Sequence, residues 1–419
     1  MKIALVHDYI KEYGGAERVL EALHEIWPDA PVFTTVYLPE FLGPHKERFN
    51  SPDGEWDIRT SFLQYIPFKE KLISPFRLIA SFVFKRFDFS KFDVVIVSAT
   101  GAYIPNTIKI RNPKSEIRNK SQNTKYKIQN TIHVCYSHTP PRYLYGYATA
   151  REWKNNILFR VLGEIANHFL RLVDFKSSQN VDYFIANSKN VAARIEKFYR
   201  REATVIYPPV EVDGRRWKIE DSNLKMEDRR SIDPQASTLK NLHSTIYHLS
   251  SKKSYFLAGG RLARPKHIDL IAEACQKLKL PLKVFGRVFA DAVNISVSQY
   301  PNIQFLGEVS DEEKLELMKN AKAYIFAAED EDFGITPVEA MSVGTPVIAY
   351  KSGGVVESII DGKTGIFYRF NDLNHLSEAV NKFEKMKFDK ETIMKHAQKF
   401  SKERFKKEIK DFITKKFKQ

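Results

Sequence analysis

The stretch AAEDEDFGITPVEAMSVGTPVIAY, residues 327–350, follows an apolar run and carries four consecutive carboxylates before a glycine and a helix-like segment. Adjacent like charges repel one another, so this run has a cost unless the structure uses its charge. In an open α/β sheet the chain turns at the carboxyl end of a strand, and ligands bind at that edge. The stretch therefore predicts a strand, a turn that forms part of a site, and a helix.

The start of the helix has the features of a phosphate site. Gly334 permits a compact turn, Thr336 is a suitable N-cap, and Pro337 fits the first helical position because it has no amide proton to leave unpaired. The free N–H groups around Ile335 and Thr336 then form a site for an anion. We therefore predict that Gly334, Ile335 and Thr336 bind the phosphates of a ligand.

Two carboxylates flank this helix start, eight residues apart. Glu331 precedes it and Glu339 lies inside the helix, so one can face a sugar while the other faces the opposite side of the phosphates. The alternative is a capping box, in which Glu339 accepts the N–H of Thr336. A capping box does not need Glu331, so the acidic run favours a site.

Strand-like and helix-like segments alternate along the chain, which predicts an α/β protein with parallel sheets. Two Rossmann-like halves meet near residues 208–255, and a chain of 419 residues is long enough for both. The predicted strands are KIALVHD, PVFTTVY, DVVIVSA, IHVCYSH, YFIANS and TVIYPP, then YFLAGG, LKVFG, IQFLG, AYIFAA and PVIAY; the predicted helices are AERVLEALHEIW, KNVAARIEKFY, HIDLIAEACQKLK, DEEKLELMKNA and VEAMSV.

The composition predicts a cytoplasmic protein without metal–cysteine sites. The two cysteines lie far apart inside apolar runs, so neither a disulfide framework nor a zinc site is expected. The first apolar run is too short for a signal peptide, and no run is long enough to span a bilayer. We therefore expect a cytoplasmic protein that is not an integral membrane protein.

The net charge of +15 is concentrated in three segments. Residues 109–130, 215–253 and 399–419 carry +6, +4 and +6, so the rest of the chain is close to neutral. Solvated loops and a terminal helix explain such runs without a nucleic-acid groove, and we predict no nucleic-acid binding. Residues 111–130 and 218–253 are biased in composition and are predicted to be insertions.

Residues 62–92 mix aromatic and aliphatic side chains with six basic and two acidic ones. An apolar surface with a basic rim suits the anionic face of a membrane. The alternative is a set of ordinary helices that pack on the N-terminal sheet. The two interpretations are compatible, so peripheral contact with the inner face of the cell membrane stays an expectation.

Several motifs together resemble the family 4 glycosyltransferases with the GT-B fold. The first is the E-x7-E form EDFGITPVEAMSVGTPVIAY, followed by SGGVVESIIDGKTGIFY. Residues 259–274, GGRLARPKHIDLIAEA, resemble the family's G-R-L-x-x-x-K element, and residues 7–23 its N-terminal Gly-Gly loop. Residues 135–147 and 185–213 are similar to bacterial mannosyltransferases of cell-surface polysaccharide synthesis. The likeness covers most of the chain outside the two insertions.

The resemblance implies two Rossmann-like domains that face an interdomain cleft. Residues 1–208 then bind the acceptor, 209–254 form a linker, and 255–395 bind the nucleotide-sugar donor, while the helix of 396–419 crosses back to the first domain. The implied catalytic residues are His138, Glu331, Arg261 and Lys266, with Gly15 among the donor-binding residues and Glu17 and Arg142 as acceptor-binding candidates.

These assignments have a chemical basis, because breaking the bond from sugar to nucleotide leaves a diphosphate that gains negative charge. Arg261 can meet that charge with a bidentate fork and Lys266 as a point charge. Without a Cβ, Gly15 lets the backbone approach the phosphate closely. His138 is implied to contact the transferred sugar as its anomeric carbon gains positive character.

The resemblance also implies the reaction class. It implies a retaining transfer of a hexose, with mannose from GDP-mannose favoured, to a glycan or a polyprenyl-linked saccharide, and no metal cofactor. Asp330 and Asp332 have the spacing of a metal-binding D-x-D motif, but cationic side chains and a helix start already cover the diphosphate. The alternatives are a transferase that uses UDP-glucose or a UDP-N-acetylhexosamine, and a catalytically silent GT-B subunit.

Overall fold

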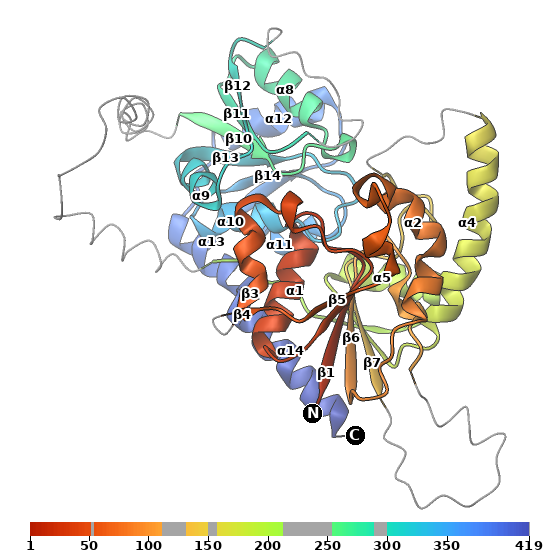
Figure 1. Cartoon of the computed structure of the whole chain (residues 1–419). Helices are drawn as coiled ribbons and strands as arrows, with labels where there is room; N and C mark the ends of the chain where they lie inside the picture. Colours follow the sequence, from red (N-terminus) through yellow and green to blue (C-terminus); the bar gives the residue numbers. More distant parts are fainter. Residues whose placement is uncertain (52–53, 111–130, 150–156, 213–253, 289–299, 419) are drawn as a thin grey trace, which may run out of the picture. The chain divides into compact units, whose positions relative to one another are not determined.

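The computed structural model of the 419-residue chain describes residues 1–51, 54–110, 131–149, 157–212, 254–288 and 300–418. It divides into two units (Figure 1). The first contains residues 1–209, 330–335 and 402–419, and the second contains residues 210–329 and 336–401. The predicted insertions at 111–130 and 218–253 lie outside the described residues.

The first unit is built on a parallel sheet in the order β5-β2-β1-β6-β7-β8-β9. Short apolar runs form these strands, and their side chains are largely buried. The strands are β1 (Ile3–His7), β2 (Val32–Thr34), β5 (Ile58–Thr60), β6 (Val94–Ala99), β7 (Ile132–Ser137), β8 (Tyr183–Ala186) and β9 (Ala203–Val205), and β3 (Asn50–Ser51) pairs with β4 (Gly54–Glu55) outside this sheet.

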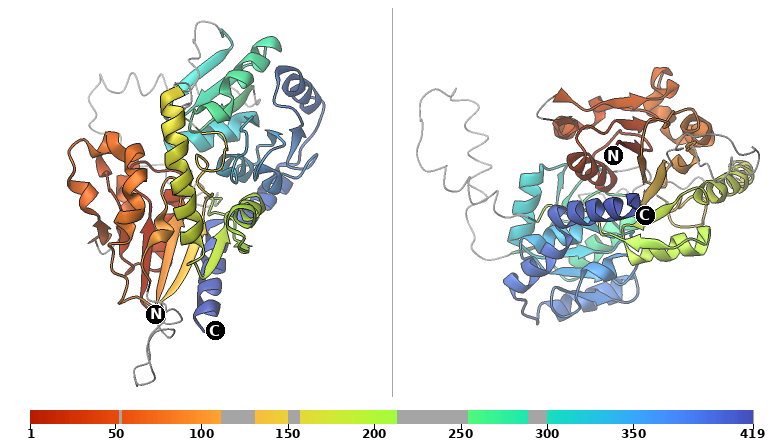
Figure 2. Two further views of the ribbon diagram at one scale, coloured as in Figure 1. Left: turned by 90° about the vertical axis from the view of Figure 1, so that its right-hand side faces the viewer. Right: turned by 90° about the horizontal axis from the view of Figure 1, so that it is seen from below.

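Helices cover both faces of this sheet. On one face α1 and α14 contribute Val19, Leu20, Phe405 and Ile409 to a common core, and on the other α2 and α5 bury their apolar sides. The left view of Figure 2 shows the strands between α2 and α14. The helices are α1 (Gly15–Ile26), α2 (Lys69–Phe84), α4 (Ile157–Ser178), α5 (Lys189–Tyr199) and α14 (Lys402–Phe417), with 3-10 turns η1 (Pro39–Phe41), η2 (Gly43–Phe49), η3 (Phe62–Tyr65) and η4 (Pro105–Thr107).

The C-terminal helix α14 belongs to the first unit through both apolar and ionic contacts. Lys402 lies 3.3 Å from Glu21 and 2.5 Å from Glu25 of α1. Lys406 adds a contact of 3.0 Å to the same Glu25. The amphipathic face of the chain's last helix is therefore buried against its first helix.

The second unit repeats the scheme with a parallel sheet in the order β12-β11-β10-β13-β14-β15. The helices α8 and α12 pack together over this sheet. The strands are β10 (Tyr255–Gly259), β11 (Leu282–Phe285), β12 (Ile303–Gly307), β13 (Ala321–Phe326), β14 (Val347–Tyr350) and β15 (Gly365–Tyr368). The helices are α8 (Ile268–Lys277), α9 (Asp311–Asn320), α10 (Ile335–Ser342), α11 (Val355–Ser358), α12 (Leu373–Phe383) and α13 (Lys390–Ala397), with η5 (Arg264–Lys266) and η7 (Gln398–Phe400).

The α/β prediction with two parallel sheets is confirmed. The prediction that Thr336 is the N-cap and Pro337 the first helical residue of its helix is wrong, because α10 begins at Ile335. Gly334 has φ of 88° and makes the turn immediately before the helix. Pro337 still fits, because the first turn of a helix leaves its N–H groups unpaired.

Other differences concern short elements. The strand predicted as TVIYPP ends at Val205, where two prolines follow within four residues. The edge strands β5 and β15 were not predicted, because each has only a few residues and little periodicity.

Gly286 is a backbone position at which the second unit tolerates no side chain. It has φ of +123°, and a Cβ there would lie 1.7 Å from the carbonyl oxygen of Gly260. We therefore expect Gly286→Ala to lower the free energy of unfolding by at least about 2 kcal/mol, through strain and forced displacement of the strand end. Thermal denaturation followed by circular dichroism measures this.

The matched control is Gly362→Ala. Gly362 also has positive φ, +74°, but a Cβ there meets no atom within 4 Å. Only backbone strain remains, on the order of 1 kcal/mol. Equal losses in the two variants would show that the contact with Gly260 contributes nothing.

Candidate functional site

Polar side chains gather at the carboxyl edge of the first sheet. His7 ends β1, Ser98 lies near the end of β6, and His138 follows β7 directly. These three strands are neighbours, and β1 and β6 mark the point where the strand order reverses. In doubly wound sheets the ligand crevice lies at such a point. All three side chains are buried.

The hydroxyl of Ser98 connects the two histidines. Its Oγ lies 3.1 Å from Nδ1 of His7 and 2.9 Å from Nε2 of His138. On the far side of His7, Nε2 lies 3.5 Å from Oε1 of Glu17. The other oxygen of Glu17 accepts the N–H of Gly14 at 2.9 Å, which caps α1. Glu17, predicted as an acceptor-binding residue, is thus placed against His7 and the start of α1.

This series of contacts favours one arrangement of protons. The Glu17 carboxylate favours a proton on Nε2 of His7, so Nδ1 of His7 accepts the Ser98 hydroxyl proton. Oγ of Ser98 then accepts a proton from Nε2 of His138, whose Nδ1 keeps a lone pair. Burial, with a smaller contribution from His7, lowers the pKa of His138 to about 3. His138 is therefore a neutral acceptor at physiological pH, which suits a neighbour that gains positive charge.

Asp8 fixes the loop that follows β6. Its carboxylate accepts the hydroxyl of Thr100 and the N–H groups of Ala102 and Tyr103, the latter two at 3.2 and 3.1 Å. Burial raises its pKa, while His7 and these hydrogen bonds act in the opposite direction. Asp8, His7 and Ser98 were missed by the sequence analysis, although a polar residue at the end of an apolar strand is a signal that could have found them.

The acidic loop of residues 330–335 is held by side chains of the first unit. Oδ1 of Asp332 lies 2.9 Å from Nη2 of Arg142 and 2.7 Å from Nη1 of Arg194. Both guanidinium groups also donate to the carbonyl oxygen of Asp330, at 2.6 and 3.1 Å. Arg194 further donates to Thr139, the residue after His138, at 3.1 Å. Arg142, an acceptor-binding candidate, thus anchors this loop.

The N-terminal end of α5 completes the anchor. Ser188, which caps α5, donates to the carbonyl oxygen of Asp332 at 2.5 Å, and Asn190 donates to that of Glu331 at 3.4 Å. The backbone on both sides of Glu331 is therefore fixed, while its side chain is half-buried. Ser188 and Arg194 were not predicted, because nothing in their local sequence indicates a distant acidic partner.

Gly15 lies where the first helix meets this loop. A Cβ on Gly15 would come within 2.9 Å of Cδ1 of Ile335. The missing side chain therefore makes room for the residue at which α10 begins. This contact brings two of the predicted donor-binding residues, Gly15 and Ile335, together.

At the carboxyl edge of the second sheet, the loop after β10 meets the start of α10. A Cβ on Gly260 would lie 3.7 Å from Oγ1 of Thr336, so the neighbouring Arg261, which is exposed, follows a turn beside the helix start. Nζ of Lys266 lies 5.1 Å from the centre of the Phe326 ring at the end of β13. The loop that carries Lys266 is thus also held at this edge.

Glu339 is buried in the second unit and forms an ion pair. Its Oε1 lies 2.9 Å from Nζ of Lys314, which also contacts Asp311 at 2.8 Å. Because α10 begins at Ile335, Thr336 is not the N-cap that the capping-box alternative requires. The carboxylate of Glu339 therefore has a structural partner in α9.

Comparison with known proteins finds a family resemblance in the second half of the chain. The model of the family described as glycosyl transferases group 1 matches residues 241–407. Residues 241–407 are therefore similar to this family. The matched region contains Arg261, Lys266, Glu331, Thr336 and Glu339.

Relatives and solved structures extend the likeness. The chain is 30% identical over 154 residues to alpha-1,3/1,6-mannosyltransferase ALG2 of Mus musculus, a match that covers 32% of this chain and 37% of that protein. The chain thus matches well under half the length of this relative. Sucrose-phosphate synthase of Thermosynechococcus elongatus superimposes with a TM-score of 0.64 at 17% identity, over 100% of this chain and 99% of that one. HepE of Anabaena, solved in complex with UDP, superimposes with a TM-score of 0.61 at 16% identity, over 99% of this chain and 100% of that one. The fold is GT-B, as predicted.

The proton arrangement around Ser98 can be tested by ¹⁵N NMR of the imidazole groups. We expect His138 to carry its proton on Nε2 and to stay uncharged as the pH falls toward 4, because its pKa is about 3. In the unfolded chain His138 takes up this proton near pH 6.5. The free energy of unfolding should therefore decrease as the pH falls from 6.5 toward 3, because only the unfolded chain binds the proton there.

Glu17→Gln removes the charge that favours this tautomer and should give a mixture of both forms at His138. Glu273→Gln, on helix α8 of the second unit, is the matched control and should leave the tautomer unchanged. A proton on Nδ1 of His138 in the native protein, or titration near pH 6.5, would contradict the arrangement.

Proposed function

We propose that this protein is a retaining glycosyltransferase that transfers a hexose, namely mannose from GDP-mannose, to a saccharide or polyprenyl-linked acceptor. The group 1 domain and the likeness to ALG2 mannosyltransferases support mannosyl transfer. The motifs at residues 135–147 and 185–213 favour cell-surface polysaccharide synthesis on the cytoplasmic side. The observation that carries the proposal is that the backbone next to Arg261 meets the start of α10, while Lys266 lies against Phe326 at the end of β13.

That position suits a departing diphosphate. Arg261 and Lys266 supply positive charge, and the first turn of α10 adds unpaired N–H groups. Positive groups placed where negative charge develops are the largest single source of catalysis in many enzymes. We assign Arg261, Lys266, Gly334, Ile335 and Thr336 to the donor diphosphate.

In the proposed reaction, the bond between the anomeric carbon and the diphosphate oxygen breaks as the acceptor hydroxyl attacks from the same face. The acceptor proton passes to the departing diphosphate, so no separate base is required. Glu331 holds a sugar hydroxyl, and the neutral His138 presents a lone pair to the sugar as its anomeric carbon gains positive character. Glu339 binds the ribose hydroxyl groups of the donor while Lys314 holds its other side.

The proposed chemistry uses no metal. Asp332, the second residue of the D-x-D spacing, already bonds two guanidinium groups through Oδ1. A divalent cation at this carboxylate would lie beside two positive charges, which is unfavourable. Asp332 is thus assigned to loop anchoring rather than to metal binding.

Turnover of a panel of nucleotide sugars tests the donor. We expect GDP-mannose to be hydrolysed or transferred, and UDP-glucose and UDP-N-acetylglucosamine to give little turnover. Turnover with a UDP-sugar alone would favour the alternative transferase, and binding without turnover of any donor would favour a silent subunit. The same assay with EDTA should be unchanged, whereas a loss restored by Mg²⁺ or Mn²⁺ would revive the Asp330/Asp332 site.

Two variants of the acidic loop separate chemistry from anchoring. Glu331→Ala should lower turnover by roughly 10²-fold, equivalent to about 2.7 kcal/mol of transition-state stabilisation. Its stability should change by less than about 1 kcal/mol, because lost repulsion from the adjacent aspartates offsets lost attraction to Arg142.

Asp332→Asn should lower stability more than turnover, unlike Glu331→Ala. The two guanidinium groups lose a shared carboxylate, so we expect a loss of at least about 2 kcal/mol of stability. Turnover and thermal denaturation measured on both variants check this. Reduced stability with full turnover in Glu331→Ala would show that the whole acidic run serves the turn alone.

A further inference from the structure

Helix α4 of the first unit exposes an apolar stripe along most of its length. Positions that recur at intervals of three and four residues lie on one side of a helix. Of the described side chains on α4, the exposed apolar ones are Ile157, Val161, Leu162, Ile165, Phe169, Leu172 and Phe175, with exposed fractions from 38% to 70%. A contiguous exposed apolar stripe of this kind is typical of an interaction surface.

The opposite side of α4, which faces the protein, is largely polar. Asn167, Asp174, Ser177 and Ser178 are buried there beside Leu170. Asp174 accepts the hydroxyl groups of Tyr145 and Tyr199 at 2.7 and 2.9 Å. A surface helix of a globular protein normally turns its apolar side to the core. In α4 this orientation is reversed, so packing within the first unit does not explain its apolar stripe.

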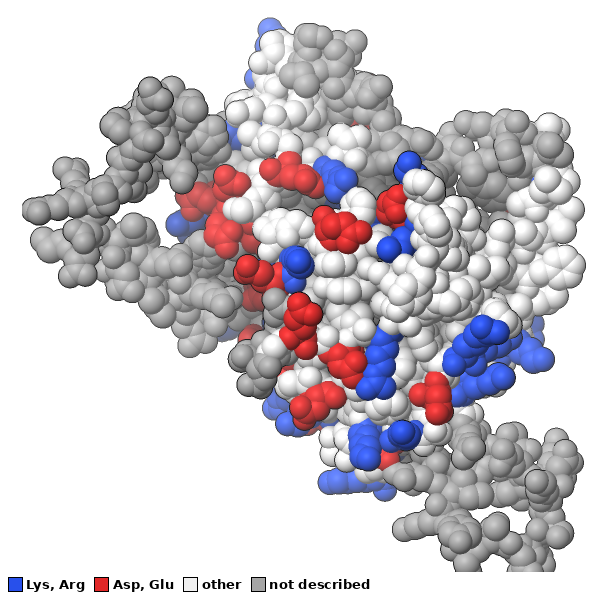
Figure 3. Space-filling model, in the orientation of Figure 1, with Lys and Arg blue, Asp and Glu red and all other residues white. Residues whose placement is uncertain are grey.

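Helix α2 lies beside α4 and extends the apolar surface (Figure 1). It buries Phe76, Ala80, Val83 and Phe84 in the core, as the packing interpretation predicted. Its other side exposes Leu78, Ile79 and Phe82 by 57%, 42% and 53%. In Figure 3 the side of the molecule that carries α2 and α4 is mostly uncharged, with Lys and Arg side chains gathered along its lower edge.

Basic residues border this surface. Residues 62–92 carry six basic and two acidic side chains, a net charge of +4. At the end of α2, Lys85 and Arg86 are exposed, and the Arg86 guanidinium lies 4.6 Å from the ring centre of Phe82. Lys71 likewise lies 5.7 Å from the ring of Phe68, which is 70% exposed. Exposed aromatic rings with cations beside them are typical of an interface between lipid and water.

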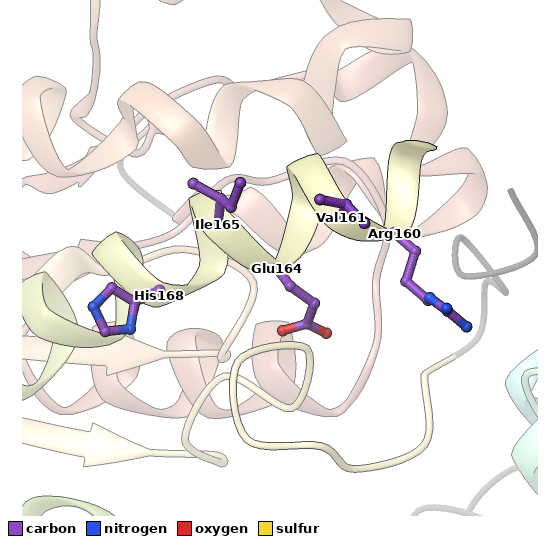
Figure 4. A pocket seen from close by; sticks show the side chains of 5 residues that line it. All are labelled: Arg160, Val161, Glu164, Ile165 and His168. Carbon is purple, nitrogen blue, oxygen red and sulfur yellow. The ribbon is translucent and has the colours of Figure 1, made fainter. Parts of the chain in front are cut away.

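Polar side chains of α4 lie beside its apolar stripe, and both line a shallow hollow on the surface. Figure 4 shows Val161 and Ile165 on one side of the helix, and Glu164 and His168 on another. Glu164 lies 3.7 Å from Arg171, so part of its charge is balanced within the helix. Within the described residues no helix is both long and apolar enough to cross a bilayer. An apolar stripe with a polar border suits a helix that lies in the plane of a membrane.

We propose that the outer side of α4, together with the exposed side of α2, binds the surface of an anionic phospholipid bilayer. The apolar side chains enter the boundary of headgroups and acyl chains, and the basic residues at the edge of α2 contact the headgroups. A second copy of this chain is the competing occupant. Two such faces in contact would bring like positive charges together, whereas anionic lipid neutralises them. This proposal goes beyond the proposed function, because no donor or acceptor takes part in the binding.

Sedimentation of the full chain with phospholipid vesicles tests the proposal. We expect binding to vesicles that contain phosphatidylglycerol, weaker binding to pure phosphatidylcholine, and a decrease as salt rises. Phe169→Glu should lower the affinity by about 30-fold or more, because it removes an aromatic side chain that enters the bilayer and adds a negative charge there. Arg86→Ser should lower it by about fivefold.

The matched control is Phe370→Glu, in the second unit. Phe370 is 60% exposed and Phe169 is 61% exposed, so both substitutions should leave the fold intact. Vesicle binding should survive in Phe370→Glu. Equal losses in the two variants, or no vesicle binding by the unmodified chain, would overturn the proposal. A concentration-dependent dimer that disappears in Phe169→Glu, measured by light scattering, would assign the surface to a second copy instead.

Discussion

The parallel direction of the strands is the constraint on which the candidate site depends. Each strand of a parallel sheet ends at the same edge, so residues that are far apart in the sequence meet wherever each follows a strand. His7, Ser98 and His138 meet in this way, although 131 residues separate the first from the last. The loop of Arg261 and the start of α10 meet at the second sheet for the same reason.

Part of the acidic run anchors the loop of residues 330–335. Asp332 is the common acceptor of Arg142 and Arg194, and the carbonyl oxygen of Asp330 receives the same two guanidinium groups. Their repulsion is offset by these cations, which bind the loop to the first unit. Glu331 lies between two anchored neighbours, so the position of its backbone is set by Arg142, Arg194 and Ser188. The anchoring contacts explain why aspartates flank Glu331 before the helix.

Buried polar groups also determine the protonation of the side chains at the carboxyl edge of the first sheet. Glu17 lies 3.5 Å from His7, and hydrogen bonds join His7 through Ser98 to His138, all of them buried. A buried imidazole with a pKa of about 3 acts without charge. The same unit turns apolar side chains outward on α4 while its inner side holds Asp174 and two serines. Polar networks therefore take the place of apolar packing in two regions of this unit.

By itself, the sequence determined the α/β class and the positions of most strands, because buried parallel strands read as short apolar runs. It did not determine where α10 begins, since Thr336 and Pro337 permit two helix starts. Only tertiary structure showed that Arg142 and Arg194 bind Asp332, and that Ser98 connects His7 with His138. It alone decided which side of α4 faces solvent, because periodicity reveals that a helix has an apolar side but not whether the core or the surroundings cover it.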